Sequence, residues 1–225
     1  MEFKDAIIKG VAEKMKEERE RSGKFTPSRM GRCYRYQIAQ RKELPESDPI
    51  SPELVLTFDI GTMVHQYVQK FFKPTQCEVK VGAGDIVGYC DYVDSECVAD
   101  FKTVGFWQWK KIENAKVSDI EVNSEQYCYQ LMTYAYLLDK PVGYLVFIKK
   151  DDMSIRQFEI KLEDWKERIE RELAILREYW ELDVLPKGEP RAYGGKECQF
   201  CSYRSTCPDK KIISSKKYTK KRSVF

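Results

Sequence analysis

The sequence predicts an α/β fold in which helices flank a mixed β-sheet. Two strand–turn–strand segments, 87–103 and 142–162, show the alternation of apolar and polar residues that half-buried strands require. Two long segments, 122–138 and 162–182, carry apolar residues at helical spacing. A chain of 225 residues is long enough to bury one substantial core.

The N-terminal third alternates helices and loops. Apolar spacing predicts helices at 3–21 and 52–72, separated by a helix-start signal at Thr26-Pro27-Ser28 and a proline-rich loop at 44–52. A turn at 73–76 and a short strand at 78–81 follow. His65, the only histidine, lies beside the apolar stripe of the second helix, where it is either a structural residue or a ligand.

The hairpin at 87–103 carries the charged residues of greatest interest. Asp100 and Lys102 share one face of its second strand because side chains alternate with a period of two, and Asp91 ends its first strand. Phe101 and Ala99 take the other face and are expected to fill a core. Two carboxylates buried without a partner would cost several kcal/mol. A Mg²⁺ or Mn²⁺ ion between them would remove their repulsion, because hard cations prefer oxygen ligands.

The segments around this hairpin offer polar and aromatic candidates. Residues 106–109 read as a loop near the site, whose aromatic side chains either stack on bases or pack under the loop. Gln130 and Tyr134 lie four apart on the helix at 122–138, so they point the same way. Arg32 and Arg35, beside Cys33, either contact phosphates or extend from an ordinary surface helix.

Composition indicates a cytoplasmic protein. No apolar run approaches the roughly 20 residues of a membrane span, and the N-terminus lacks the layout of a signal peptide. We therefore expect no membrane partner. The net charge of +3 is uninformative, but residues 210–225 hold seven Lys or Arg and no acid. This basic tail either lies on phosphates or is a solvated end.

The cysteines indicate a metal site. Eight cysteines in a chain of this kind do not suggest a disulfide framework. Cys198, Cys201 and Cys207 follow a Cys-x2-Cys-x5-Cys spacing, and Cys33 is the sensible fourth ligand. Tetrahedral zinc and a cubane iron–sulfur cluster both take four protein ligands, so spacing alone does not choose between them.

Taken in order, these motifs resemble the RecB-like PD-(D/E)XK nucleases that carry a four-cysteine iron–sulfur cluster. The resemblance covers about residues 33–208, and the similarity is greatest to the CRISPR-associated exonuclease family, the fourth Cas protein. The AddB nuclease domain is a relative. Two departures are visible: Asp100 stands where many members have Glu, and Cys90 precedes Asp91 where the motif has Pro. Neither departure removes a charge.

The resemblance implies a set of site residues. It implies a 4Fe-4S cluster bound by Cys33, Cys198, Cys201 and Cys207. It implies a Mg²⁺ or Mn²⁺ ion bound by His65, Asp91, Asp100 and the carbonyl of Phe101, with Lys102 as the catalytic lysine. Gln130 and Tyr134 would support the site and the DNA, and Arg32 and Arg35 would track the DNA backbone.

The resemblance also implies a fold and an activity. The fold would be a restriction-endonuclease-like core within one nuclease domain at 1–209, with a cluster lobe formed by about 22–45 and 190–209. The activity would be metal-dependent hydrolysis of phosphodiester bonds in single-stranded DNA or at DNA ends, chiefly as an exonuclease, with endonuclease cleavage as an additional option. The cellular role would be CRISPR spacer acquisition with integrase partners, or a stand-alone viral, prophage or repair nuclease.

Two rival interpretations come from other classes of protein. A non-catalytic nucleic-acid-binding module with a structural zinc suits the cysteines and the basic tail, but leaves the alignment of Asp91, Asp100 and Lys102 without a purpose. A partner-binding subunit with a vestigial site is disfavoured by the intact acidic pair and its lysine.

Overall fold

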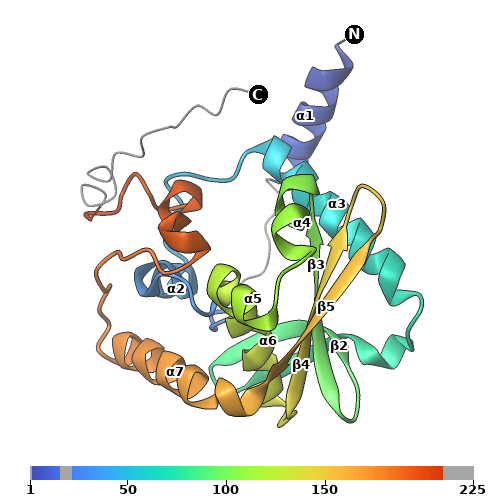
Figure 1. Cartoon of the computed structure of the whole chain (residues 1–225). Coiled ribbons are helices and arrows are strands. Elements are labelled where there is room, and N and C mark those ends of the chain that lie inside the picture. The colour runs from blue at the N-terminus through green and yellow to red at the C-terminus, as the bar shows by residue number, and fades with distance from the viewer. Residues whose placement is uncertain (1, 16–21, 210–225) are drawn as a thin grey trace.

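The computed structural model describes residues 2–15 and 22–209 and builds them around one five-stranded sheet (Figure 1). The strands are β1 (Cys77–Ala83), β2 (Ile86–Val93), β3 (Cys97–Val104), β4 (Val142–Lys149) and β5 (Ile155–Lys161). They lie in sequence order across the sheet, and β3 and β4 form the parallel pair among antiparallel neighbours. The predicted mixed sheet flanked by helices is confirmed.

The parallel pair requires a crossover, because strands that run the same way cannot be joined by a tight turn. The chain makes this crossover with three helices, α4 (Phe106–Ile112), α5 (Val117–Asn123) and α6 (Glu125–Leu137). The remaining helices are α1 (Phe3–Lys14), α2 (Tyr34–Arg41), α3 (Pro52–Gln69) and α7 (Lys166–Glu181).

The sheet is covered on both faces. Val98 and Val104 of β3 join the larger core with α6 and α7, whereas Ala99 and Phe101 join a smaller core with Val64 and Val68 of α3. Figure 1 shows α3 on one side of the sheet and α6 and α7 on the other. The predicted division of the β3 side chains between two faces is therefore confirmed.

Three elements differ from the sequence prediction. Residues 106–109 begin α4 rather than a loop, because Trp109 and Ile112 lie three apart and both are buried. The helix predicted over 122–138 is two helices, α5 and α6, because Ser124 between them leaves the helical conformation. The first hairpin strand ends at Val93, two residues beyond Asp91.

The C-terminal segment of the described chain lies against the segment around α2. The C-terminal segment, red in Figure 1, lies beside α2, so residues about 165 positions apart become neighbours. The basic tail at 210–225 falls outside the described residues. Among the residues that are described, no helix is both long and apolar enough to cross a membrane.

Candidate functional site

Strands β2 and β3 separate at the position of Asp91. They pair only at Tyr92 with Ala99 and at Val93 with Val98. Beyond these pairs the Phe101 N–H has a side-chain acceptor in place of a backbone carbonyl. It donates a 2.7 Å hydrogen bond to Asp91 Oδ2. Asp91 is therefore held in the gap between the two strands, next to the backbone of Phe101.

Asp100 and Lys102 face this gap from β3. Asp100 is 1% exposed, and its Oδ2 atom lies 2.6 Å from the Lys102 Nζ atom. This contact lacks good hydrogen-bond geometry, so Oδ2 has no well-formed hydrogen bond to any described residue. Two carboxylates and an ammonium thus converge at the point where β2 and β3 separate, as the strand periodicity predicts.

His65 reaches the same point from α3. Its Nδ1 atom lies 3.7 Å from Asp91 Oδ2, and its ring meets the Phe101 ring edge-on. Burial, together with the charge of Lys102, lowers the pKa of His65. A neutral imidazole has a lone pair available for a metal ion. The structure therefore brings His65, Asp91, Asp100 and Phe101 together, although they lie on three different elements.

Helix α6 braces the gap from the opposite side. The Lys102 ammonium donates a 3.1 Å hydrogen bond to Gln130 Oε1, and the Tyr134 hydroxyl donates a 2.7 Å bond to the carbonyl of Tyr89 on β2. Gln130 and Tyr134, which were predicted to point the same way, therefore bind neighbouring strands. Gln130 binds β3, and Tyr134 binds β2. Tyr127, one turn before Gln130, places its ring 5.0 Å from the Lys102 ammonium, a contact that the sequence analysis missed.

The electrostatics of the gap favour a bound cation. Burial raises the pKa of both Asp91 and Asp100, although the charge of Lys102 opposes this shift. Burial also disfavours the Lys102 ammonium, but Asp100 and Asp91 outweigh this effect and hold its pKa above the usual value. One ammonium is shared between two buried carboxylates, so oxygen ligands and negative charge remain for a hard cation.

A profile of the PD-(D/E)XK nuclease superfamily matches residues 70–208, which is more than half of the chain. The chain belongs to the PD-(D/E)XK nuclease superfamily. The match spans Asp91, Asp100 and Lys102, the three residues that meet where β2 and β3 separate. No curated protein sequence matches the chain.

Two solved proteins have a fold similar to that of this chain. The crystal structure of SSO0001 aligns with a TM-score of 0.57 at 20% identity, over 92% of this chain and 97% of that chain. The alkaline exonuclease LHK-Exo from Laribacter hongkongensis, in complex with dAMP, aligns with a TM-score of 0.50 at 14% identity. That alignment covers 72% of this chain and 89% of the exonuclease chain. At these identities the likeness shows the fold alone.

A cysteine-lined cavity lies where the C-terminal segment meets α2. This small cavity is lined by all four cysteines of the predicted ligand set, which are Cys33, Cys198, Cys201 and Cys207. The remaining four cysteines, which are Cys77, Cys90, Cys97 and Cys128, do not line this cavity. The structure therefore brings together the four cysteines of the predicted ligand set.

The cavity is fitted to these cysteines. A side chain at Gly188 would place its Cβ atom 2.6 Å from Cys207 Sγ, so the backbone approaches this thiol more closely than any other residue type allows. Among residues 2–15 and 22–209, no group of three or more His, Cys, Asp or Glu gathers closely enough to hold a single metal ion, and this applies to the four thiols and to His65, Asp91 and Asp100 alike. Four thiols are the ligand number of both a tetrahedral zinc ion and a cubane iron–sulfur cluster.

Glu197 joins the two cysteine-bearing segments, and the sequence analysis missed it. Its buried carboxylate accepts hydrogen bonds from the Cys33 N–H at 3.0 Å, the Arg191 N–H at 3.1 Å and the Ala192 N–H at 3.2 Å. It also accepts one from Arg32 Nε at 3.0 Å. A Glu next to a Cys in a polar segment gives no sequence signal, because its partners are far away in the chain.

Glu172 of α7 forms a second buried carboxylate centre nearby. It accepts hydrogen bonds from the Gly31 N–H at 3.0 Å, from the Tyr34 hydroxyl at 3.0 Å and from Arg191 at 2.7 Å. Glu172 and Glu197 share Arg191, so the segment before α2 is fixed on two sides. Glu197 lines the cysteine cavity, whereas Glu172 does not. Both carboxylates fix the segment that carries Cys33.

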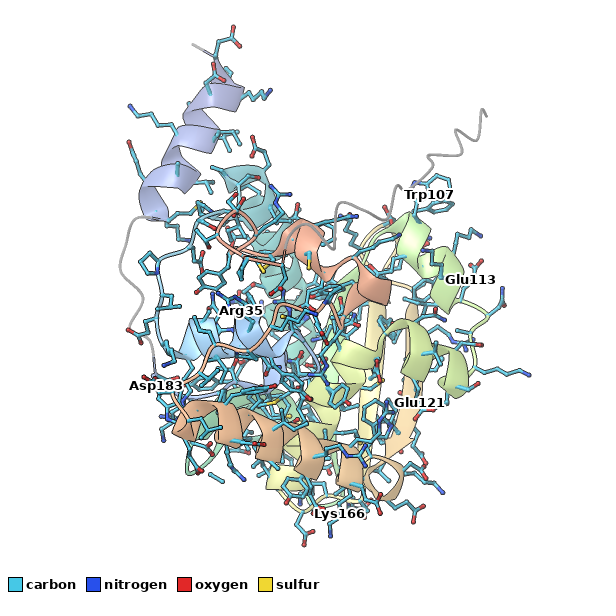
Figure 2. The ribbon with its side chains drawn as sticks, turned by 90° about the vertical axis from the view of Figure 1, so that its left-hand side faces the viewer. Arg35, Trp107, Glu113, Glu121, Lys166 and Asp183 are labelled. Atoms are coloured by element: carbon cyan, nitrogen blue, oxygen red, sulfur yellow. The ribbon has the colours of Figure 1, made fainter. Side chains whose placement is uncertain are left out.

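The two predicted DNA-contacting arginines have internal partners. Arg32 pairs with Glu197 and stacks over the Tyr36 ring at 3.8 Å, and its side chain is only 13% exposed. Arg35 donates a 3.2 Å hydrogen bond to the carbonyl of Pro186 and also lines the cysteine cavity (Figure 2). Arg32 and Arg35 therefore both have partners within the protein, and their contact with DNA stays a prediction.

Proposed function

We propose that this protein is a divalent-metal-dependent deoxyribonuclease that hydrolyses phosphodiester bonds in single-stranded DNA or at DNA ends. The observation that carries the proposal is the convergence of Asp91, Asp100 and Lys102 where β2 and β3 separate. The superfamily match over residues 70–208 supports it. Exonuclease action is the main expectation, with endonuclease cleavage as an additional one.

In this proposal the residues divide the work of hydrolysis. Asp91, Asp100, His65 and the carbonyl of Phe101 would hold Mg²⁺ or Mn²⁺, which supplies Lewis-acid stabilisation of the scissile phosphate. The Lys102 ammonium would orient the attacking water and stabilise the charge that develops on the phosphate oxygens. Water adds to phosphorus, one P–O ester bond breaks, and the departing oxygen takes up a proton. Cation binding requires Lys102 Nζ to move away from Asp100 Oδ2, while Gln130 keeps it near the phosphate.

The decisive experiment compares cleavage of end-labelled single- and double-stranded DNA in Mn²⁺, in Mg²⁺ and in EDTA. We expect Lys102→Met to slow cleavage by about 10²- to 10³-fold, since it removes one preorganised charge from the transition state. Far-ultraviolet circular dichroism checks that the variant is folded. Lys161→Met is the matched control, because the Lys161 side chain is mostly exposed and pairs only with Glu163 in the described structure. Equal cleavage rates for Lys102→Met and wild type would remove this assignment.

We further propose that Cys33, Cys198, Cys201 and Cys207 bind a 4Fe-4S cluster that joins the ends of one nuclease domain at 1–209. Its lobe would comprise about 22–45 and 190–209. The shared cavity and the close approach of Gly188 to Cys207 support this proposal. Anaerobic purification, metal analysis and a visible spectrum test it. One zinc per chain and no visible absorbance would favour the rival zinc-stabilised module at this lobe.

For the cellular role we propose DNA trimming in CRISPR spacer acquisition. Only the resemblance to the CRISPR-associated exonuclease family supports this role, through the four cysteines and the nuclease motif in one chain. Processing of overhanging DNA ends in the presence and absence of a CRISPR integrase tests it. Cleavage that the integrase neither redirects nor accelerates would favour a stand-alone viral, prophage or repair nuclease.

A further inference from the structure

Trp107 is the one highly exposed tryptophan of the four in the chain. Its side chain is 80% exposed, whereas Trp109 is 8% exposed, Trp165 is fully buried and Trp180 is partly buried. Figure 2 shows Trp107 projecting from the edge of the molecule at α4. An exposed indole offers a flat aromatic face to a partner from solution.

The Trp107 ring lies on a helix whose other face is buried, and it packs against a second aromatic ring. Trp109 and Ile112 anchor α4 in the larger core, one helical turn further on. Phe106, itself 44% exposed, meets the Trp107 ring at an angle of 81° with centroids 5.2 Å apart. The two rings therefore form one exposed aromatic surface, named here the α4 platform.

The α4 platform lies near the candidate active site. Trp107 follows Lys102 by five residues, so their Cα atoms are at most about 18 Å apart even if the chain between them is extended. The platform begins where β3 ends, and β3 and β4 run parallel and end at the paired residues Val104 and Lys149. Ligands of open α/β sheets bind at this carboxyl edge.

The charges around the platform suit a phosphate backbone. The ammonium groups of Lys110 and Lys149 lie 5.6 and 5.7 Å from the centroid of the Phe106 ring. Each also pairs with an acid, Lys110 with Glu113 and Lys149 with Asp152. Two more lysines lie in this region, and both are exposed. Lys111 is on α4, and Lys150 is in the turn after β4. Asp151 is the remaining acid of this turn, which leaves a small positive balance.

We propose that the α4 platform is a base-stacking site for single-stranded DNA whose scissile phosphate lies at Lys102. The inference rests on the proposed nuclease function and adds a specificity-determining residue to it. Aromatic side chains stack on any unpaired base, and nearby lysines track the backbone. In a duplex the base faces are covered by neighbouring bases, so the platform favours single strands over paired ends.

Intrinsic fluorescence of the full-length protein tests the inference directly, because Trp107 is the indole that a base can reach. Titration of a thymidine oligonucleotide in EDTA, which leaves the DNA intact, should quench the wild-type signal. Trp107→Phe should abolish this quenching while it retains a stacking ring. Anisotropy of a labelled oligonucleotide at fixed low salt should show about 5- to 100-fold weaker binding for Trp107→Ala and a smaller loss for Trp107→Phe.

Leu182→Ala is the matched control, because Leu182 is 62% exposed and lies at the end of α7, away from the sheet edge. It should bind the oligonucleotide as wild type does. Wild-type affinity of Trp107→Ala, undiminished quenching of Trp107→Phe, or equal quenching by blunt duplex DNA would each overturn the inference. Cleavage by wild type in Mn²⁺ is scored separately, so the nuclease function can stand while the platform fails.

Discussion

Glu197→Gln changes a single atom of the carboxylate that joins the C-terminal segment to the segment before α2. The Glu197 carboxylate is 1% exposed and accepts hydrogen bonds from three backbone N–H groups and from Arg32. Glutamine keeps the shape of the side chain but removes the negative charge. It also replaces one acceptor oxygen with an NH₂ group, which would face N–H donors or the Arg32 guanidinium.

The expected cost follows from the burial of this pair. Removing one partner of a buried ion pair leaves the other charge uncompensated, which costs about 3–5 kcal/mol. The Arg32 side chain is only 13% exposed, so water can relieve little of this cost. In a chain of this size 1 kcal/mol corresponds to roughly 2–4 °C in Tm, so we expect Tm to fall by about 6–20 °C.

Thermal unfolding of the anaerobically purified protein measures this effect, with bound iron and sulfide determined on the same samples. Glu163→Gln is the control, because Glu163 is exposed and its ion pair with Lys161 spans 3.7 Å. We expect the control to change Tm by less than about 2 °C. If Glu197→Gln matches the control, the buried carboxylate does not join the two segments and the reasoning is refuted.

Two further substitutions test the region around the cysteine cavity. Gly188→Ala places a methyl group 2.6 Å from Cys207 Sγ, whereas the methyl group of Gly61→Ala meets nothing within 4 Å. For the 4Fe-4S cluster proposed above, we expect Gly188→Ala to lose most of the iron and Gly61→Ala to retain it. Equal iron in both variants would contradict the fit of the cavity to the cluster. Hydrogen bonds from the Ser205 N–H, the Ser205 hydroxyl and Ser47 lower the pKa of Asp48 to about 2. A lowered pKa stabilises the folded state above the unfolded value of 3.8, and this stabilisation is lost as the pH falls toward 2. Urea midpoints should therefore fall more steeply between pH 4 and pH 2 for wild type than for Asp48→Asn, and parallel curves would count against this role.

Periodicity was a sound guide to the site because its central residues lie close together in the sequence. Alternation along a strand already puts Asp100 and Lys102 on one face and Phe101 on the other. Helical spacing likewise puts Gln130 and Tyr134 on one side of α6. These relations depend only on local backbone geometry, so a correct assignment of strand or helix is enough to predict them.

The error at residues 106–109 shows where local reading fails. Four consecutive residues, three of them aromatic, suggested a loop, but the burial of Trp109 beside an exposed Trp107 is the signature of a helix on the sheet edge. Which tryptophan faces the core depends on how α4 packs against β4, and no local pattern contains that information. The same is true of the break at Ser124 between α5 and α6.

Residue order and spacing were sufficient for the α/β class and for the hairpin that carries the acids and the lysine. Those features depend on neighbours a few positions away, where backbone geometry sets which side chains meet. Packing between distant elements decided the rest. It placed His65 next to Asp91, the Glu197 carboxylate at the Cys33 N–H, and Trp107 in solvent. Such contacts form only when the whole core closes, because burial and ion pairing are decided by partners that lie far away in the chain.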